Sequence, residues 1–157
     1  MNEVTLREVT RENWRDTLHL AVSPEQQRFI ADCVPIAAIA LAKAYIRPAG
    51  LVWVPYAFYV NTEMVGFTEL AYEPGSVENY WLFHFFIDQR YQGQGYGKKA
   101  LQVFLQFIKD RHVECRSIQL SVHPENERAQ HLYTSAGFQP TGAELDHEPV
   151  YRLRLKS

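Results

Sequence analysis

Apolar positions recur with two different periods along this chain of 157 residues, and each period predicts one kind of element. Apolar residues separated by one or two polar residues predict a short strand over residues 4–9, and alternation with arginines predicts another over residues 151–155. Repeats of three and four positions predict helices over residues 14–22, 98–111 and 124–136. Strands and helices therefore both contribute to the fold.

A further helical region is expected after residue 22. Ser23 stands directly before Pro24, and proline favours the first position of a helix, so we predict a helix that begins at Pro24 with Ser23 as its cap. Pro35 either breaks this helix or begins another, because proline lacks the backbone donor that a helix interior needs. The following helix is predicted to run to about Ile46.

Residues 51–88 show a different pattern, rich in β-branched and aromatic side chains and interrupted by turn-forming residues at 61–63 and 73–76. We predict three strands joined by two short turns, which makes them antiparallel neighbours. Residues 117–122 are predicted to add another strand. The order of these elements predicts a mixed α/β or α+β fold in one domain, residues 1–157, with helices covering both faces of the sheet.

Composition narrows the classes of partner. The formal charge of −2 and a pI near 6.3 argue against general binding to nucleic acid or to an anionic membrane surface. The longest apolar stretch, residues 33–42, contains Pro35 and is far shorter than the roughly 20 residues of a membrane-spanning helix. The first residues lack the pattern of a secretory signal, so we expect a cytoplasmic protein.

The two cysteines, Cys33 and Cys115, lie far apart in the sequence. Without an export signal we interpret them as buried thiols rather than as a disulfide. His112 and Cys115 have a spacing that could suit a metal, but no second pair of ligands completes a zinc site. We therefore expect no metal.

The most informative segment is a glycine-rich loop between an apolar strand and a helix. Gly93, Gly95 and Gly97 follow the strand over residues 81–87 and lead directly into the helix. Glycine lets a backbone approach a ligand closely, and the first N–H groups of a helix attract anions, so the loop is a candidate phosphate site. Its spacing fits neither a P-loop nor a dinucleotide fingerprint, and a purely structural turn is the alternative.

Two motifs together give the chain a family resemblance. Gln92-x-x-Gly95-x-Gly97 follows a Phe-Phe-Ile-Asp strand end, and about 30 residues later the sequence runs Pro-Glu-Asn-Glu-Arg-Ala-Gln-His-Leu-Tyr over residues 124–133. This combination resembles the GNAT acetyltransferases along essentially the whole chain, and most closely the bacterial spermine/spermidine (diamine) N-acetyltransferases. The resemblance implies a central, mostly antiparallel sheet of six to seven strands flanked by about four helices.

The resemblance also implies acetyl-CoA as co-substrate. Backbone N–H groups of the loop would hold the pyrophosphate, and the pantetheine arm would pair with the strand before it, as an added strand would. The implied cofactor-binding residues come from that strand, the loop and the next helix: Phe85, Phe86, Ile87, Gln92, Gly93, Gln94, Gly95, Tyr96, Gly97, Lys98 and Asn126.

The family reading gives Tyr133 the role of general acid, because the departing thiolate must be protonated. Asn126 lies about two turns before it on one helix face, although a helix cap and a core aromatic are the structural alternatives. The base is less determined by the sequence, and His84, Glu69 and Asp88 are the candidates. His84 has the ordinary pKa that suits a base, and Glu69 and Asp88 are also candidates for holding a cationic acceptor.

We therefore expect direct acetyl transfer from acetyl-CoA to a primary amine, a polyamine such as spermidine or spermine. A protein N-terminus, an amino acid or an aminoglycoside are alternative acceptors for the same fold. A non-catalytic acyl-CoA-binding sensor is the alternative outside enzymes. The exposed strands and many aromatic residues are compatible with a homodimer, and we expect neither a nucleic acid nor a membrane as partner.

Overall fold

A computed structural model describes residues 3–32 and 34–156, and these form a single sheet with helices on both sides. The α-helices are α1 (Trp14–Thr17), α2 (Pro24–Ile30), α3 (Ile36–Ile46), α4 (Tyr96–Arg111) and α5 (Glu127–Ser135). The strands are β1 (Val4–Glu8), β2 (Val52–Val60), β3 (Glu63–Tyr72), β4 (Tyr80–Ile87), β5 (Ser117–Ser121), β6 (Gln139–Leu145) and β7 (Glu148–Arg154). Short 3₁₀ turns, η1 (Pro48–Gly50) and η2 (Gln89–Tyr91), complete the order.

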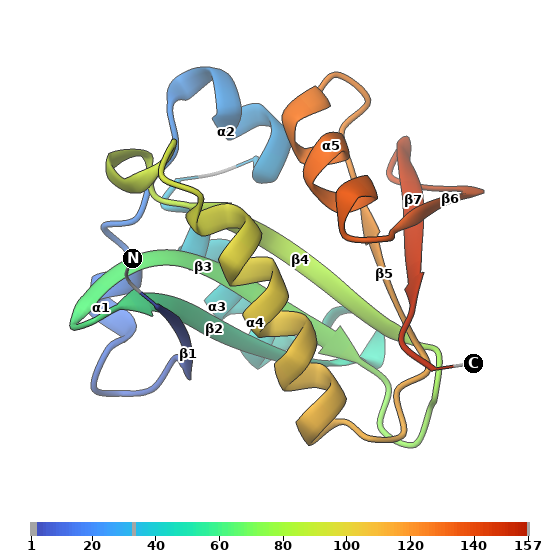
Figure 1. Cartoon of the computed structure of the whole chain (residues 1–157). Coiled ribbons are helices and arrows are strands. Elements are labelled where there is room, and N and C mark those ends of the chain that lie inside the picture. Colours follow the sequence, from blue (N-terminus) through green and yellow to red (C-terminus); the bar gives the residue numbers. More distant parts are fainter. Residues whose placement is uncertain (1–2, 33, 157) are drawn as a thin grey trace.

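The strand order is β1-β2-β3-β4-β5-β7-β6, and every neighbouring pair is antiparallel except β4 and β5. The parallel pair meets only at Trp81 and Gln119, after which the two strands diverge, as Figure 1 shows. Three of the seven strands, β2 to β4, are therefore the meander that the sequence predicts. The gap in pairing between β4 and β5 leaves one backbone edge of β4 without a neighbouring strand.

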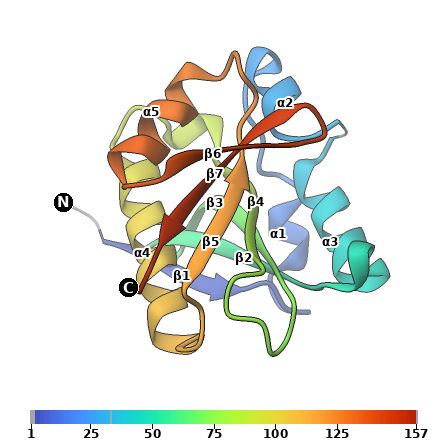
Figure 2. The ribbon, with the colours of Figure 1, turned by 90° about the vertical axis from the view of Figure 1, so that its right-hand side faces the viewer.

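Helices cover both faces of the sheet (Figure 2). One face of α4 packs on the side where the larger core lies, through apolar residues three and four positions apart: Ala100, Leu101, Phe104, Leu105 and Ile108. On the other side α3 buries Ile36, Ala37 and Ala40 in a second, smaller cluster. The layers confirm the predicted mixed α/β class with helices on both faces.

Some local predictions need correction. The helix predicted over residues 14–22 ends at Thr17, because the backbone at Ala21 bonds to Asp88 and Gln89 instead of continuing the helix. Ser23 does precede α2, but its hydroxyl makes no capping hydrogen bond. The sequence pattern also missed β6, whose Pro140 and Gly142 hide the strand.

Cys115 is a buried free thiol, as predicted, whereas Cys33 lies outside the described residues. Among the helices that the structure describes, none is long and apolar enough to cross a membrane. Within residues 3–32 and 34–156, no three histidine, cysteine or acidic side chains are grouped as metal ligands would be.

Candidate active site

The glycine loop enters α4 with an open N-terminus. Gly93 and Gly95 have φ values of 79° and 82°, in the left-handed region that glycine adopts without strain. Gly95 is the N-cap of α4, and no side chain caps the helix there. The N–H groups of the first helical turn therefore point outward unpaired by the helix, where they can bind an anion.

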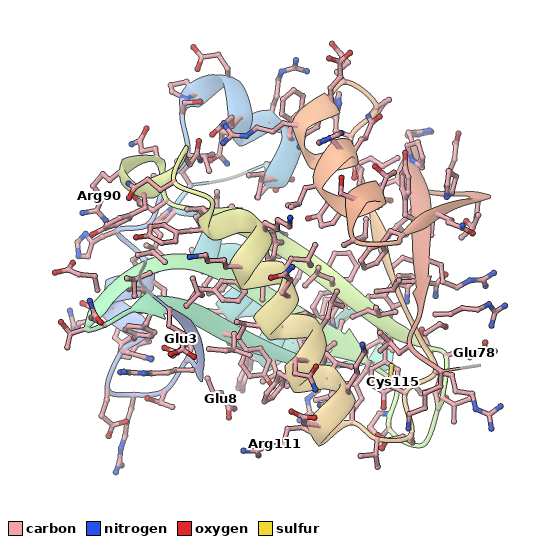
Figure 3. The ribbon with its side chains drawn as sticks, in the orientation of Figure 1. Glu3, Glu8, Glu78, Arg90, Arg111 and Cys115 are labelled. Atoms are coloured by element: carbon pink, nitrogen blue, oxygen red, sulfur yellow. The ribbon has the colours of Figure 1, made fainter. Side chains whose placement is uncertain are left out.

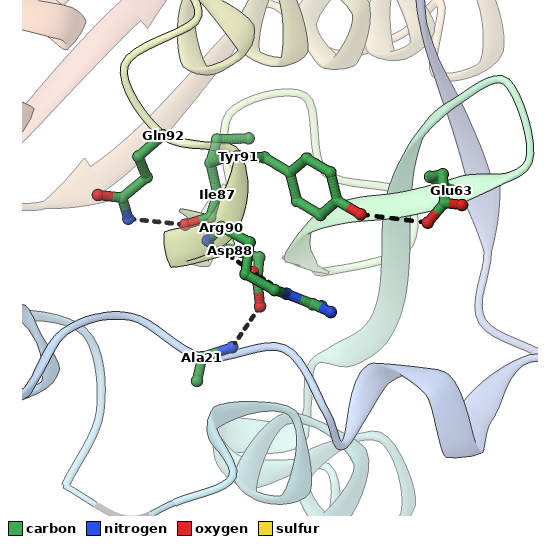
Figure 4. A network of polar contacts seen from close by, with 7 residues as sticks. All are labelled: Ala21, Glu63, Ile87, Asp88, Arg90, Tyr91 and Gln92. Carbon is green, nitrogen blue, oxygen red and sulfur yellow. Dashed lines mark hydrogen bonds and ion pairs between the residues drawn. The ribbon is translucent and has the colours of Figure 1, made fainter.

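A buried carboxylate supports the base of the loop. Asp88 is 1% exposed and accepts hydrogen bonds from the backbone N–H of Ala21 and Arg90, both at 2.9 Å, and from Arg90 Nε at 2.8 Å (Figure 4). Burial alone raises the pKa of Asp88, but these hydrogen bonds outweigh it and lower the pKa below its ordinary value. The carboxylate is thus fully engaged in joining the loop to the segment before α2.

Gln92 ties the same loop to two neighbours. Its Nε2 donates to the backbone oxygen of Ile87 at 2.8 Å and to Gln26 Oε1 at 3.0 Å, while Gln26 Nε2 donates back to Gln92 Oε1 at 3.2 Å. Figure 4 shows the bond to Ile87, beside the Tyr91 hydroxyl that donates to Glu63. The glutamine of the loop motif therefore orders the loop and fastens α2 over it.

A cavity of about 720 Å³, here called the loop cavity, lies between this loop, β4, α2 and α5. Ten of the eleven residues that the family resemblance implies for the cofactor line it, and Gln94 is the exception. The sequence analysis missed Arg128 of α5, a second cation that lines this cavity with Lys98. It also missed the cover that Phe29 and Ile30 of α2 provide, together with Val22 just before that helix. Nothing in the local pattern of α2 distinguishes a cavity wall from an ordinary amphipathic helix.

A second cavity of about 540 Å³ lies between α2, α3, β4, β5, α5 and the turn between β6 and β7. It is here called the bulge cavity, after the bulge of β4 that lines it. It shares six residues with the loop cavity: Phe29, Ile30, Phe85, Asn126, Ala129 and Tyr133. The two cavities therefore meet at one wall.

Tyr133 and Asn126 stand at that shared wall. Tyr133 is 7% exposed, and its ring packs edge-on against Phe85 with 6.2 Å between ring centres. Burial raises the pKa of Tyr133 above its ordinary value, so the phenol keeps its proton throughout the neutral range. The Oδ1 atom of Asn126 accepts from the N–H of Ala129 at 3.2 Å, so this residue caps α5 as well as lining both cavities.

His84 lies in a bulge of β4, where the strand has one residue more than β3 between paired positions. Its φ is 53°, and its ring lines the bulge cavity. Nδ1 lies 3.2 Å from the carbonyl oxygen of Ile30, which can only accept, so Nδ1 carries the hydrogen. Nε2 then accepts from Lys43 Nζ at 3.1 Å, and burial followed by the Lys43 charge lowers the pKa of His84 to about 4.

Glu69 lies in β3, opposite Phe83 of β4 and Pro55 of β2. Its side chain is fully buried, and neither carboxyl oxygen has a hydrogen-bond partner. Burial raises the pKa of Glu69 to about 8, although the charge of Lys43 opposes the rise. Neither Glu69 nor Asp88 lines the loop cavity or the bulge cavity, so the structure separates these two from the other predicted site residues.

Comparisons with known proteins agree with this architecture. Residues 6–138 match the model of the acetyltransferase (GNAT) family. A spermine/spermidine N(1)-acetyltransferase of Bacillus subtilis (strain 168) is 34% identical over 148 residues, which cover 91% of each chain.

Solved structures show the same fold at lower identity. A spermidine N-acetyltransferase from Vibrio cholerae, in complex with CoA and spermine, superposes with a TM-score of 0.73 at 17% identity, over 98% of this chain and 95% of that one. An aminoglycoside acetyltransferase in complex with coenzyme A gives a TM-score of 0.77 at 19% identity, over 98% and 95% of the two chains. The sheet, the uncapped helix behind the glycine loop and the family match lead to one conclusion: the chain belongs to the acetyltransferase (GNAT) family and is an acetyl-CoA-dependent N-acetyltransferase.

Proposed function

We propose that the protein acetylates a primary amine of a polyamine such as spermidine or spermine, by direct attack of the amine on acetyl-CoA in a ternary complex. The observation that carries this proposal is the wall shared by the loop cavity and the bulge cavity, with Tyr133 in it. A thioester that reaches this wall from one side meets an amine that reaches it from the other. Proximity of this kind supplies much of the acceleration in a two-substrate reaction.

Acetyl-CoA binds in the loop cavity in this proposal. The unpaired N–H groups at the start of α4, with Lys98 and Arg128 beside them, suit the pyrophosphate. The edge of β4 that β5 leaves unpaired passes along Phe85, Phe86 and Ile87. Apart from the Ile87 oxygen, which accepts from Gln92, backbone groups on this edge can pair with the amides of the pantetheine arm. This arrangement carries the thioester toward Tyr133.

Tyr133 serves as the general acid. When the amine attacks, negative charge develops on the sulfur, and a neutral phenol at the shared wall can donate a proton to the departing thiolate. The raised pKa of Tyr133 keeps that proton in place until the charge develops. Asn126, which lines both cavities, is proposed to hold the CoA arm beside it.

The bulge cavity receives the acceptor. Three carboxylates from two separate segments line it, Asp32 before α3 and Asp146 and Glu148 at the turn between β6 and β7. They suit the distal ammonium groups of a polyamine, and the Bacillus subtilis relative is named for such acceptors. Asp88 has no place in this acceptor site, because its oxygens are held in the loop network.

Free-thiol release from acetyl-CoA tests the proposal, with spermidine, spermine, putrescine, lysine, an aminoglycoside and a short peptide as acceptors. Selective turnover of polyamines is the expected result, and the paired change Asp146→Asn with Glu148→Gln should raise the KM for spermine more than the KM for a mono-amine. Turnover confined to the peptide or the aminoglycoside would reject the polyamine. CoA binding without thiol release from any amine would favour the sensor instead.

A further inference from the structure

His84 lies in the wall of the bulge cavity, where protein groups engage both nitrogens of its ring. We propose that this histidine is a positioning residue for the acceptor and not its base: it fixes the end of α2 and the Lys43 ammonium in the wall that the acceptor contacts. The inference rests on the proposed function, because it concerns the amine that the bulge cavity is proposed to receive. It goes beyond that function by giving His84 a role that requires no proton transfer.

The bulge of β4 gives the ring access to the helices beside the strand. Thr68 of β3 faces two residues of β4, His84 and Phe85, because the strand pairing shifts there by one position. Such a bulge re-aims a side chain that regular alternation would hold on one face of the sheet. The backbone of His84 has a φ of 53°, in the left-handed region, which histidine adopts more readily than most residues.

One ring nitrogen holds the end of α2. Nδ1 of His84 donates to the carbonyl oxygen of Ile30 at 3.2 Å, and Ile30 is the last residue of that helix. The last carbonyl groups of a helix have no partner within the helix, so a donor from a neighbouring strand satisfies one of them. The Ile30 side chain lines both cavities, so this bond acts beside the place where the two substrates are proposed to meet.

The position of α2 depends on contacts of this kind. None of its seven residues is fully buried, and its start is held by the paired side-chain amides of Gln26 and Gln92. Figure 1 shows the helix between the glycine loop and α5. The Arg28–Glu125 ion pair spans 3.5 Å, but both side chains are more than half exposed, so it adds little stability. Loss of the bond from His84 should therefore free the end of α2 that covers the bulge cavity.

The other ring nitrogen positions Lys43 of α3. Nε2 accepts from Lys43 Nζ at 3.1 Å, and the same Nζ lies 5.0 Å from the centre of the Trp53 ring and 5.2 Å from that of Phe83. Aromatic faces attract a cation at such distances, so these contacts hold the ammonium group at the cavity wall. An acceptor ammonium is repelled by this charge and attracted by Asp146 and Glu148, which line the same cavity from the turn between β6 and β7.

These two bonds use both the donor and the lone pair of a neutral imidazole. One nitrogen of such a ring carries the hydrogen and the other the lone pair, and here the lone pair accepts from Lys43. Burial, followed by the charge of Lys43, lowers the pKa of His84 to about 4, while the bond to Ile30 and the charge of Asp32 act in the opposite direction. The ring therefore stays neutral in the neutral pH range, and both bonds persist.

The test compares His84→Asn and His84→Leu with the unchanged protein, as pH profiles of kcat and of the spermine KM with saturating acetyl-CoA. Asparagine tolerates the same φ and can donate from Nδ2 to the Ile30 oxygen, but it cannot take up a proton. It should keep the spermine KM within about threefold and preserve the shape of the kcat profile. Leucine removes both bonds, so the spermine KM should rise by about tenfold while kcat falls less.

The two variants separate positioning from proton transfer. If the kcat of His84→Asn near neutral pH falls by about 10²–10⁴-fold and recovers in alkali, His84 is the base and the inference is overturned. An unchanged spermine KM in His84→Leu would also overturn it, because the ring would then position nothing that the acceptor contacts. His19→Leu makes the same replacement at an exposed histidine outside both cavities and should change neither parameter. The dissociation constant for CoA reports whether each variant keeps its fold.

A nuclear magnetic resonance measurement tests the inference without turnover. With ¹⁵N-labelled imidazole rings, the signals that His84→Asn removes should belong to a neutral ring with its hydrogen on Nδ1, at neutral and at mildly acidic pH. A hydrogen on Nε2 would overturn the inference, because Nδ1 could not then donate to Ile30; so would a titration near the ordinary pKa of about 6.5. Failure of every amine in the thiol assay would instead reject the proposed function.

Discussion

Replacing Glu69 with glutamine should change how the stability of the protein depends on pH. The side chain is fully buried in β3 and its carboxyl oxygens are unbonded, so the folded state favours the neutral form of the carboxyl group. Glutamine has nearly the same shape and no charge. The substitution therefore isolates the ionisation of this one group.

The size of the effect follows from the pKa. Glu69 has a pKa of about 8 in the folded protein and an ordinary value of 4.5 when unfolded. Between these two values the folded state keeps a proton that the unfolded chain releases, so the free energy of unfolding falls as pH rises. At about 1.4 kcal/mol for each pH unit, the loss is on the order of 5 kcal/mol, fully present by about pH 8 and absent below pH 4.5.

Urea unfolding at pH 5, 7 and 9 measures this loss. The unchanged protein should lose several kcal/mol of unfolding free energy between pH 5 and 9 beyond what Glu69→Gln loses. The other groups titrate alike in the two proteins. The difference between their two dependences of unfolding free energy on pH therefore reports the ionisation of Glu69. Parallel curves for the two proteins would refute the reasoning, because they would show that Glu69 has the same pKa folded and unfolded.

Three further changes test the loop and the general acid. Tyr133→Phe should lower kcat by about 10²–10⁴-fold while calorimetry finds nearly unchanged acetyl-CoA binding; unaltered kcat would remove the acid role. Gly95→Val forces a β-branched residue to a φ of 82° in otherwise open space, so titration should show CoA binding at least about tenfold weaker, whereas an unshifted dissociation constant would contradict the loop assignment. Gln92→Leu removes the hydrogen bonds to Ile87 and Gln26, and CoA binding weakened by about tenfold is expected; equal affinity would show that the loop holds its shape without them.

The sequence predicts those parts of the fold that have local causes. The periodic apolar face of α4 and the turn-bounded meander from β2 to β4 appear within a few residues of their expected limits. The end of α1 could not be predicted, because the backbone N–H of Ala21 donates a hydrogen bond to Asp88, 67 positions away. The strand β6 was missed because its pairing with β7 overrides its proline and glycine.

The candidate site likewise has parts that a local sequence pattern predicts and parts that depend on tertiary packing. The glycine loop and Tyr133 stand out because short motifs carry their chemistry, and the loop cavity contains them. The full burial of Glu69 in β3 and the charge of Lys43 from α3 that acts on it both come from tertiary packing, which has no local signal. The lowered pKa of His84 likewise comes first from burial and then from the charge of Lys43, 41 positions away in sequence, so its ordinary pKa was a poor guide.

The composition of the shared wall also bears on the order of chemical events. Of its six residues, only Tyr133 carries an oxygen nucleophile, and burial raises its pKa, so it remains a neutral phenol that attacks a thioester poorly. The Cys115 thiol, with a pKa raised to about 11, lies at the opposite end of α4 from the glycine loop (Figure 3). Neither group is suited to hold the acetyl group, which supports direct transfer.

Incubating the protein with acetyl-CoA in the absence of an amine checks this point. Intact mass spectrometry should then find no acetylated protein, and varying both substrates should give intersecting rather than parallel double-reciprocal lines. A stoichiometric acetyl adduct that spermine discharges would instead establish a covalent intermediate. In that case the shared wall would position a protein nucleophile, and Tyr133 would have to be reconsidered as its acid.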